Sequence, residues 1–277
     1  MLTDELLTGL LYLGITLGYL APYLLCLKVI WSDKELISMS SYQLMFALGI
    51  CDIVVSAAHI FAGITTALQA GAEQHAPLNL FMGGVSLAGF YAYMVYQTIL
   101  AANRLAIIVF KKKSWFTARR LKACHVLCAL YGSVILALNT FHCSDFEYDM
   151  REYTWMLLPA TCNEVLYYVD MVVHIAMLVA SFALYAIVFS HLRKLRALQS
   201  SENPHERSEF RVLIQASLSC VYTSLMVISW HEGHKLLPAW LWTSRLQYCL
   251  WIGNSAIMPL IYLAVNRLVA TGKQHQP

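Results

Sequence analysis

The chain has 277 residues, of which 59% are hydrophobic and only 13% are charged, and its formal net charge is +3. A soluble domain carries about 45–50% apolar and about 25% charged residues, because its surface must present polar groups to water. This composition excludes a soluble globular protein and predicts an integral membrane protein. A net charge this small gives no sign of nucleic-acid binding.

Apolar stretches of about 20 residues recur along the chain, and this is the length that a helix needs to cross the hydrocarbon core. Helices pair every backbone N–H and C=O internally, as lipid requires, whereas a β-barrel would show shorter alternating segments. We predict an all-α, seven-transmembrane bundle that forms one domain over residues 1–277. The expected spans are 6–30, 42–70, 79–108, 121–141, 164–190, 209–231 and 240–266.

Basic residues gather at alternate joints between the spans. They crowd residues 111–122 and 193–196, and Arg267 and Lys273 follow the last span, whereas acids such as Asp145 occupy the other joints. Lys and Arg mark the cytoplasmic side of a membrane protein. The pattern therefore predicts an extracellular N-terminus and a cytoplasmic C-terminus, which agrees with an odd number of spans.

Three motifs occur in order at defined depths of the spans. The second span holds LGICD, which ends at Asp52, the third ends with NRL from Asn103, and the seventh carries PLIY from Pro259 after Asn254. Together these motifs resemble those of rhodopsin-like G-protein-coupled receptors. The segments 19–22 (YLAP), 41–45 (SYQLM), 100–104 (LAANR) and 259–263 (PLIYL) further resemble nematode serpentine chemoreceptors, class T first and class X next.

This resemblance implies a chemosensory receptor, a multi-pass protein in the plasma membrane of a sensory cell. Its partners would be an extracellular small molecule, a heterotrimeric G protein and membrane lipid, and it would not be an enzyme. The resemblance assigns G-protein coupling to Asn103 and Arg104. It assigns the conformational switch to four residues, Asp52, Asn254, Pro259 and Tyr262.

Two of these assignments have alternatives. Arg104 is either a coupling residue or a positive-inside anchor whose aliphatic stem snorkels to the interface. An acid inside lipid is costly, so Asp52 is a switch, a sodium ligand in a small polar pocket, or a structural acid with satisfied partners.

Six residues are candidates for ligand contact: Ser86, Phe90, Asp170, His174, Trp230 and Trp251. The resemblance places Ser86 and Phe90 on the ligand face of the third span. Asp170 and His174 lie one turn apart in the outer half of the fifth span, so they share a helix face. They either contact the ligand, form a local polar pair or serve as a partner for Arg245. Aromatic residues such as Trp230 and Trp251 either close the pocket floor or belong to packing and the interface belt.

The chain also departs from the wider receptor family. That family carries a cysteine at the outer end of the third span, bonded to the second outer loop, but here the position is about Asn79. Cys143 and Cys162 flank a loop that would face the oxidising exterior, where disulfides form. We therefore expect a disulfide between these two cysteines. Met258 stands where asparagine usually precedes the proline, and the sixth span lacks the family's proline.

Other functional classes find less support. A zinc protease site needs H-E-x-x-H, and residues 231–234 (HEGH) are one position short, so we predict no metal site. A transporter or ligand-gated channel, the main alternative, would show internal repeats, broken helices or several midplane charges, and only Asp52 qualifies. An intramembrane enzyme would need a paired catalytic site, but Asp52 and Asp170 lie at different depths.

Overall fold

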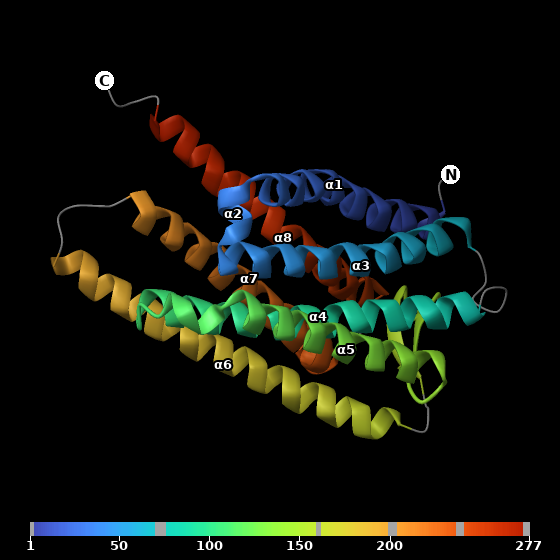
Figure 1. The fold of residues 1–277 in the computed structure, drawn as a ribbon. Coiled ribbons are helices and arrows are strands. Elements are labelled where there is room, and N and C mark those ends of the chain that lie inside the picture. The colour runs from blue at the N-terminus through green and yellow to red at the C-terminus, as the bar shows by residue number, and fades with distance from the viewer. Residues whose placement is uncertain (1–2, 70–75, 159–161, 199–203, 237–240, 274–277) are drawn as a thin grey trace.

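The computed structural model describes residues 3–69, 76–158, 162–198, 204–236 and 241–273. Seven long helices form one bundle (Figure 1): α1 (Asp4–Ser32), α3 (Ser40–Leu68), α4 (Ala76–Ile108), α5 (Ala118–Thr140), α6 (Asn163–Leu198), α7 (Pro204–Leu236) and α8 (Leu241–Lys273). Each predicted span coincides with one of these helices. The short helix α2 (Lys34–Ser38) precedes α3, and the 3-10 helix η2 (Lys113–Phe116) precedes α5.

The helices present apolar side chains on their outward faces. Six described helices carry a stretch long and apolar enough to cross a membrane: α1, α3, α4, α5, residues 171–194 of α6 and residues 213–233 of α7. The remaining long helix, α8, packs against α1 and α7. Leu25, Leu127 and Val179 are each more than 60% exposed, which water would penalise and lipid does not.

The two ends of the bundle differ. Figure 1 shows the start of α1 and a β-hairpin at one end, here called the hairpin end. The short helix α2 and the end of α8 lie at the opposite end, here called the α2 end. At the hairpin end, Thr3 caps α1 by accepting the Leu6 N–H at 3.3 Å, and Asp4 and Glu5 follow in the first turn, where the helix dipole favours acids.

The hairpin is the main element that the hydrophobic pattern did not predict. Strands β1 (Asp145–Asp149) and β2 (Thr154–Leu158) pair antiparallel, where we expected only a polar joint. Phe146 and Tyr148 are buried while the alternating acids Asp145, Glu147 and Asp149 are partly exposed, so DFEYD has the two-residue period of a strand. Helix-scale hydropathy does not detect a segment this short.

Candidate functional site

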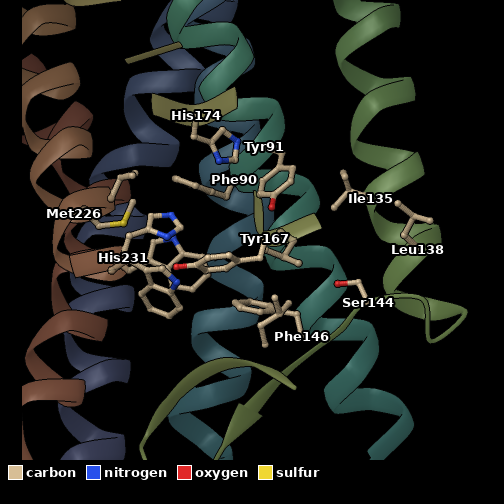
Figure 2. Close-up of a pocket in the computed structure, with 15 residues that line it drawn as sticks. Phe90, Tyr91, Ile135, Leu138, Ser144, Phe146, Tyr167, His174, Met226 and His231 are labelled. Carbon is tan, nitrogen blue, oxygen red and sulfur yellow. The ribbon is translucent and has the colours of Figure 1, made fainter. Parts of the chain in front are cut away.

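A cavity of about 120 Å³ lies between helices α4 to α8, next to the hairpin. Figure 2 shows labelled side chains of α4, α5, α6, α7 and strand β1 around it. The lining residues are Leu87, Phe90, Tyr91, Ile135, Leu138, Ser144, Phe146, Leu157, Tyr167, His174, Met226, Val227, Trp230, His231 and Trp251. Apolar and aromatic groups dominate this set, with a few polar atoms among them, as in most small-molecule sites.

Aromatic contacts connect the walls of the cavity. The His174 ring lies 4.5 Å from Tyr91 and 5.6 Å from Phe90, centroid to centroid. Trp230 of α7 and Trp251 of α8 meet edge to face at 5.1 Å. Edge-to-face pairs at these distances are favourable, so α4, α6, α7 and α8 share one continuous aromatic wall.

The hairpin forms the roof of the cavity through Phe146 and Leu157. A disulfide joins Cys143 to Cys162 and so closes the segment that contains both strands. Where the wider receptor family has its cysteine, Asn79 of α4 holds the hairpin with its amide. Its Oδ1 accepts the Tyr148 N–H at 3.0 Å, and its Nδ2 donates to the Tyr148 carbonyl at 3.1 Å.

A second buried amide, that of Asn139, binds strand β1 at Phe146. Asn139 Oδ1 accepts the Phe146 N–H at 2.8 Å, and its Nδ2 donates to the Leu80 carbonyl at 2.6 Å. Gly83 of α4 allows the close approach, because a β-carbon there would collide with the Phe146 carbonyl oxygen. The hairpin therefore packs backbone to backbone on α4.

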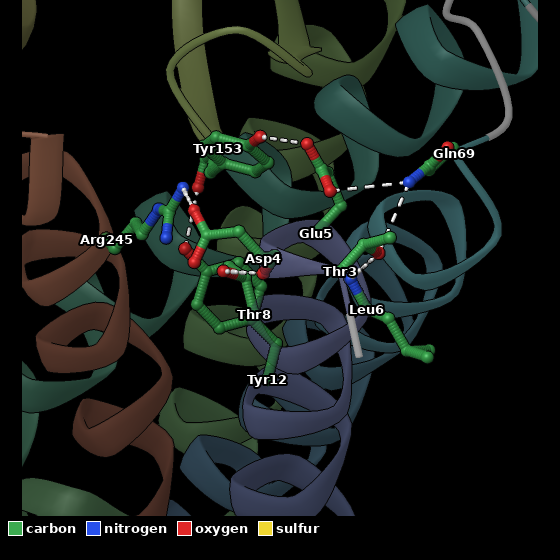
Figure 3. Close-up of polar contacts among 9 residues, drawn as sticks. All are labelled: Thr3, Asp4, Glu5, Leu6, Thr8, Tyr12, Gln69, Tyr153 and Arg245. Atoms are coloured by element: carbon green, nitrogen blue, oxygen red, sulfur yellow. Dashed lines mark hydrogen bonds and ion pairs between the residues drawn. The ribbon is translucent and has the colours of Figure 1, made fainter. Parts of the chain in front are cut away.

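Arg245 of α8 ties the hairpin to α1 (Figure 3). Its Nη2 lies 2.6 Å from Asp4 Oδ2, and its guanidinium lies 4.2 Å from the centroid of the Tyr153 ring. The Tyr153 hydroxyl donates to Glu5 at 3.4 Å. The described residues pair Arg245 with Asp4 of α1, and the side chain of Asp170, its predicted partner, lies outside the described part of the chain.

Near the α2 end, Arg104 is fully buried and bound to its neighbour. Its Nη2 donates to Asn103 Oδ1 at 3.1 Å. Ser41 of α3 donates to the same oxygen at 2.9 Å, and Asn103 Nδ2 donates to Ser40 at 2.9 Å. We call these four residues the inner latch. In this conformation the latch keeps the Arg104 guanidinium from the protein surface.

Asp52 lies between the cavity and the inner latch, and only 2% of it is exposed. The Tyr23 hydroxyl donates to its carboxylate. Tyr93, the bulky residue near Asp52 on α4, engages Ser219 of α7 at 2.7 Å. A sodium ion needs several free oxygens around one carboxylate, but in the described part of the chain these hydroxyls are engaged with one another or with Asp52. Sodium binding at Asp52 stays one of the alternatives that the sequence leaves open.

A polar chain links α4, α7 and α8. Thr223 donates to Asn254 Oδ1 at 2.8 Å, and Gln97 Nε2 lies 3.4 Å from the Thr223 hydroxyl. Gln215 donates to the Met258 carbonyl, directly before the buried Pro259. Three of the predicted switch residues therefore lie inside the bundle, and the side chain of Tyr262 falls outside the described part.

A family model described as the serpentine type 7TM GPCR chemoreceptor Srt matches residues 5–273, which is nearly the whole chain. This chain belongs to the Srt chemoreceptor family. No curated protein matches the chain. The Srt receptor is thus a multi-pass protein of the plasma membrane, in a family of chemoreceptors rather than enzymes.

Four of the six predicted ligand contacts line the cavity of the Srt receptor: Phe90, His174, Trp230 and Trp251. Their contact with a ligand stays a prediction. Ser86 is fully buried and is not among the lining residues. The side chain of Asp170 lies outside the described part of the chain.

Sequence reasoning missed several lining residues of the Srt receptor. His231 was considered only as a metal ligand, yet its ring meets Tyr167 at 5.6 Å on the cavity wall. Phe146 was overlooked because it lies in the loop, although the alternation of DFEYD marks it as inward-facing. Tyr91 follows Phe90 directly, and no signal in the sequence separates it from a residue that faces lipid.

Proposed function

We propose that the Srt receptor binds a compact, largely apolar molecule in the cavity and passes the signal to a heterotrimeric G protein at the α2 end. The observation that carries this proposal is the pairing of two sites in one bundle. An aromatic cavity lies under a disulfide-closed hairpin at one end, and a buried arginine is latched near the other.

The size and lining of the cavity support a small ligand. An apolar cavity of about 150 Å³ in another protein binds benzene, whereas drug-sized molecules occupy about 300–1,000 Å³. At about 120 Å³, this cavity suits a single ring or a short branched chain. The hydroxyls and imidazoles of Ser144, Tyr167, His174 and His231 favour one polar group on the ligand, such as an alcohol or a carbonyl.

Two observations support an outward-facing hairpin end. The disulfide between Cys143 and Cys162 lies there, and disulfides persist in oxidising surroundings. The basic joints at residues 111–122 and 193–196 lie at the other end, as the positive-inside rule requires of the cytoplasmic side. In this orientation, the ligand arrives from outside and the G protein from inside.

A ligand activates only if it binds one arrangement of the helices better than another. Trp230 and Trp251 line the cavity from α7 and α8. About one turn after Trp251, Asn254 bonds to Thr223 of α7, so a ligand that separates the tryptophans also shifts this pair. The resulting movement of α7 would free Arg104 from Asn103 and let it meet the G protein.

Cells that express the receptor with a promiscuous G protein provide the test, through a screen of compact volatile molecules. Replacing His174 or Trp251 by Ala should raise the agonist EC50 at least tenfold, and Arg104→Ala should abolish the response while surface expression persists. Val172→Ala is the control, because this exposed residue of α6 does not line the cavity. Unchanged potency of the cavity variants, or normal signalling by Arg104→Ala, would contradict the proposal.

The switch role of Asp52 needs its own variant. We assign the conformational change to Asp52 together with Asn254, Pro259 and Tyr262, without a bound ion. Asp52→Asn keeps the shape of the side chain but removes its charge, and it should change basal signalling or agonist potency. A response identical to that of the unmodified receptor would remove Asp52 from the switch.

A further inference from the structure

Trp155 has an unusual position for a loop residue. It belongs to β2, in the connection between α5 and α6, yet it is fully buried and is the largest such side chain in the described part of the chain. Its indole Nε1 donates to the Tyr248 hydroxyl of α8 at 3.0 Å. That hydroxyl also lies 2.9 Å from Nδ1 of His59 on α3. One loop side chain thus joins a hydrogen-bonded group that bridges two helices of the bundle.

The rings around Trp155 connect it to the ligand cavity. Phe146 stacks on Trp155 at 5.8 Å, with 15° between the ring planes, and also lines the cavity. Trp251 lines the cavity from α8 and lies 6.2 Å from Tyr248 and 5.7 Å from His59. A molecule in the cavity therefore touches residues that contact Trp155 and its hydrogen-bonding partners.

A ligand changes a receptor by contacts that differ between two arrangements of the helices. A side chain on a tethered segment can make such contacts without a bimolecular binding step, since its effective concentration is set by the tether. Here the tether is short and ordered, because the Cys143–Cys162 disulfide, Asn79 and Asn139 hold the hairpin. Order in the free state lowers the entropic cost of binding.

We propose that the β1–β2 hairpin is a tethered inhibitory ligand of this receptor, with Trp155 as its anchor in the bundle. Trp155 makes its contacts in an arrangement where Arg104 is buried and held by Asn103, so these contacts stabilise the silent state. A diffusible ligand would act partly by moving Phe146 and Trp251 against this anchor. The inference rests on the proposed function, since it describes the regulation of the same cavity.

The first test is constitutive signalling without added ligand, normalised to the amount of receptor at the cell surface. Trp155→Phe retains most of the ring but removes the N–H, and Tyr248→Phe removes the hydroxyl that accepts it. Each variant should raise basal G-protein activation by about threefold or more, which corresponds to the loss of one buried hydrogen bond. The double variant should be no more active than the stronger single variant, because both remove the same interaction.

Trp31→Phe is the matched control, since Trp31 is a 65% exposed tryptophan of α1 far from the hairpin. Its basal signal should equal that of the unmodified receptor. Unchanged or lower basal activity in Trp155→Phe and Tyr248→Phe, at normal surface expression, would overturn the proposal.

A second readout does not depend on a G protein. In the purified receptor in lipid nanodiscs, Trp155→Phe should speed amide hydrogen exchange in peptides around Arg104, whereas Trp31→Phe should not. If hydrogen exchange around Arg104 becomes faster but no variant signals, the G-protein function is refuted. The hairpin would then still be a segment that stabilises this arrangement of the helices. Unchanged exchange together with unchanged signalling would refute the tethered ligand.

Discussion

Arg104 donates a hydrogen bond to the neutral amide of Asn103. The guanidinium is charged and the amide is neutral, so a carboxylate at position 103 would add the attraction between opposite charges to this hydrogen bond. The Arg104–Asn103 contact is therefore weaker than an Arg104–carboxylate contact at the same position would be.

Strengthening the latch should silence the receptor further. Asn103→Asp would pair a carboxylate with Arg104 and accept hydrogen bonds from Ser40 and Ser41, which lie within 3 Å. We expect basal signalling about fivefold lower and a higher agonist EC50, in line with a gain of about 1 kcal/mol. Asn103→Ala should do the opposite, and higher basal activity in Asn103→Asp would refute this view of the latch.

Glu147 should give the hairpin a pH dependence. Burial, assisted by the nearby Asp145, raises the pKa of the Glu147 carboxyl above its usual value. A pKa raised by folding means that Glu147 favours the folded state in acid and that this contribution is lost as the pH rises through the folded-state pKa. At neutral pH, the charged carboxylate therefore costs stability.

The Glu147→Gln variant should remove this dependence. Thermal unfolding in detergent should show a Tm above that of the unmodified receptor near pH 7 and a similar Tm near pH 4, about the usual pKa of glutamate. Glu35→Gln, on an exposed residue at the α2 end, serves as the control. A lower Tm for Glu147→Gln than for the unmodified receptor at neutral pH would contradict the predicted loss of stability from the charged Glu147 carboxylate.

Individual residues of the site were predictable where a helix face fixed them. Phe90 and His174 follow from their depth and face on two apolar spans, and both line the cavity. Ser86 lies on the same face as Phe90 but is not among the lining residues. His231 could not be recognised, because a histidine near a helix end looks the same in sequence whether it faces a cavity or water.

At the scale of elements, the hairpin depends on one close approach to α4. The Phe146 backbone lies against Gly83, and its strand cannot yield easily, since two asparagines and a disulfide hold it. A larger residue at position 83 must therefore displace the roof of the cavity.

Gly83→Ala should lower the Tm of the purified receptor. Overpacking of this kind costs about 1–3 kcal/mol, and each kcal/mol shifts the Tm of a protein of this size by about 2–4 °C. Agonist potency should fall as well. Gly14→Ala on α1 is the matched control, because nothing lies within 4 Å of a β-carbon there. Equal Tm values for the two variants would show that the hairpin does not press on α4.

The helices were predictable and the hairpin was not, for a physical reason. A span must be apolar over about 20 residues because lipid is its solvent, so its signal is long. Each strand has only five residues, and its partners are side chains of α1, α4, α5 and α8 that are distant in sequence. No feature of the local sequence around Trp155 indicates that this side chain is buried in the bundle.

For the whole molecule, the count of seven came from hydropathy together with the alternation of charge. The structure and the family match confirm the seven-helix bundle. The orientation in the membrane rests on the charges and the disulfide alone, so it stays a prediction.

Epitope accessibility on intact cells tests this orientation. A tag before Asp4 should bind antibody without permeabilisation, and a tag inserted between α6 and α7 should bind only after it. The α6–α7 joint is flanked by Arg193 and Lys194, which the positive-inside rule places in the cytoplasm. The reverse labelling pattern would overturn the orientation and, with it, the proposed route of the ligand.

The roof of the cavity is a single continuous segment bounded by Cys143 and Cys162. Cavity-lining side chains such as Leu157 lie on strands whose backbone is held in place by other residues. Substitutions at positions such as Leu157 can therefore reshape what the receptor detects while Trp155 and its contact with Tyr248 of α8 stay in place. New ligand preferences would then arise from changes in one loop.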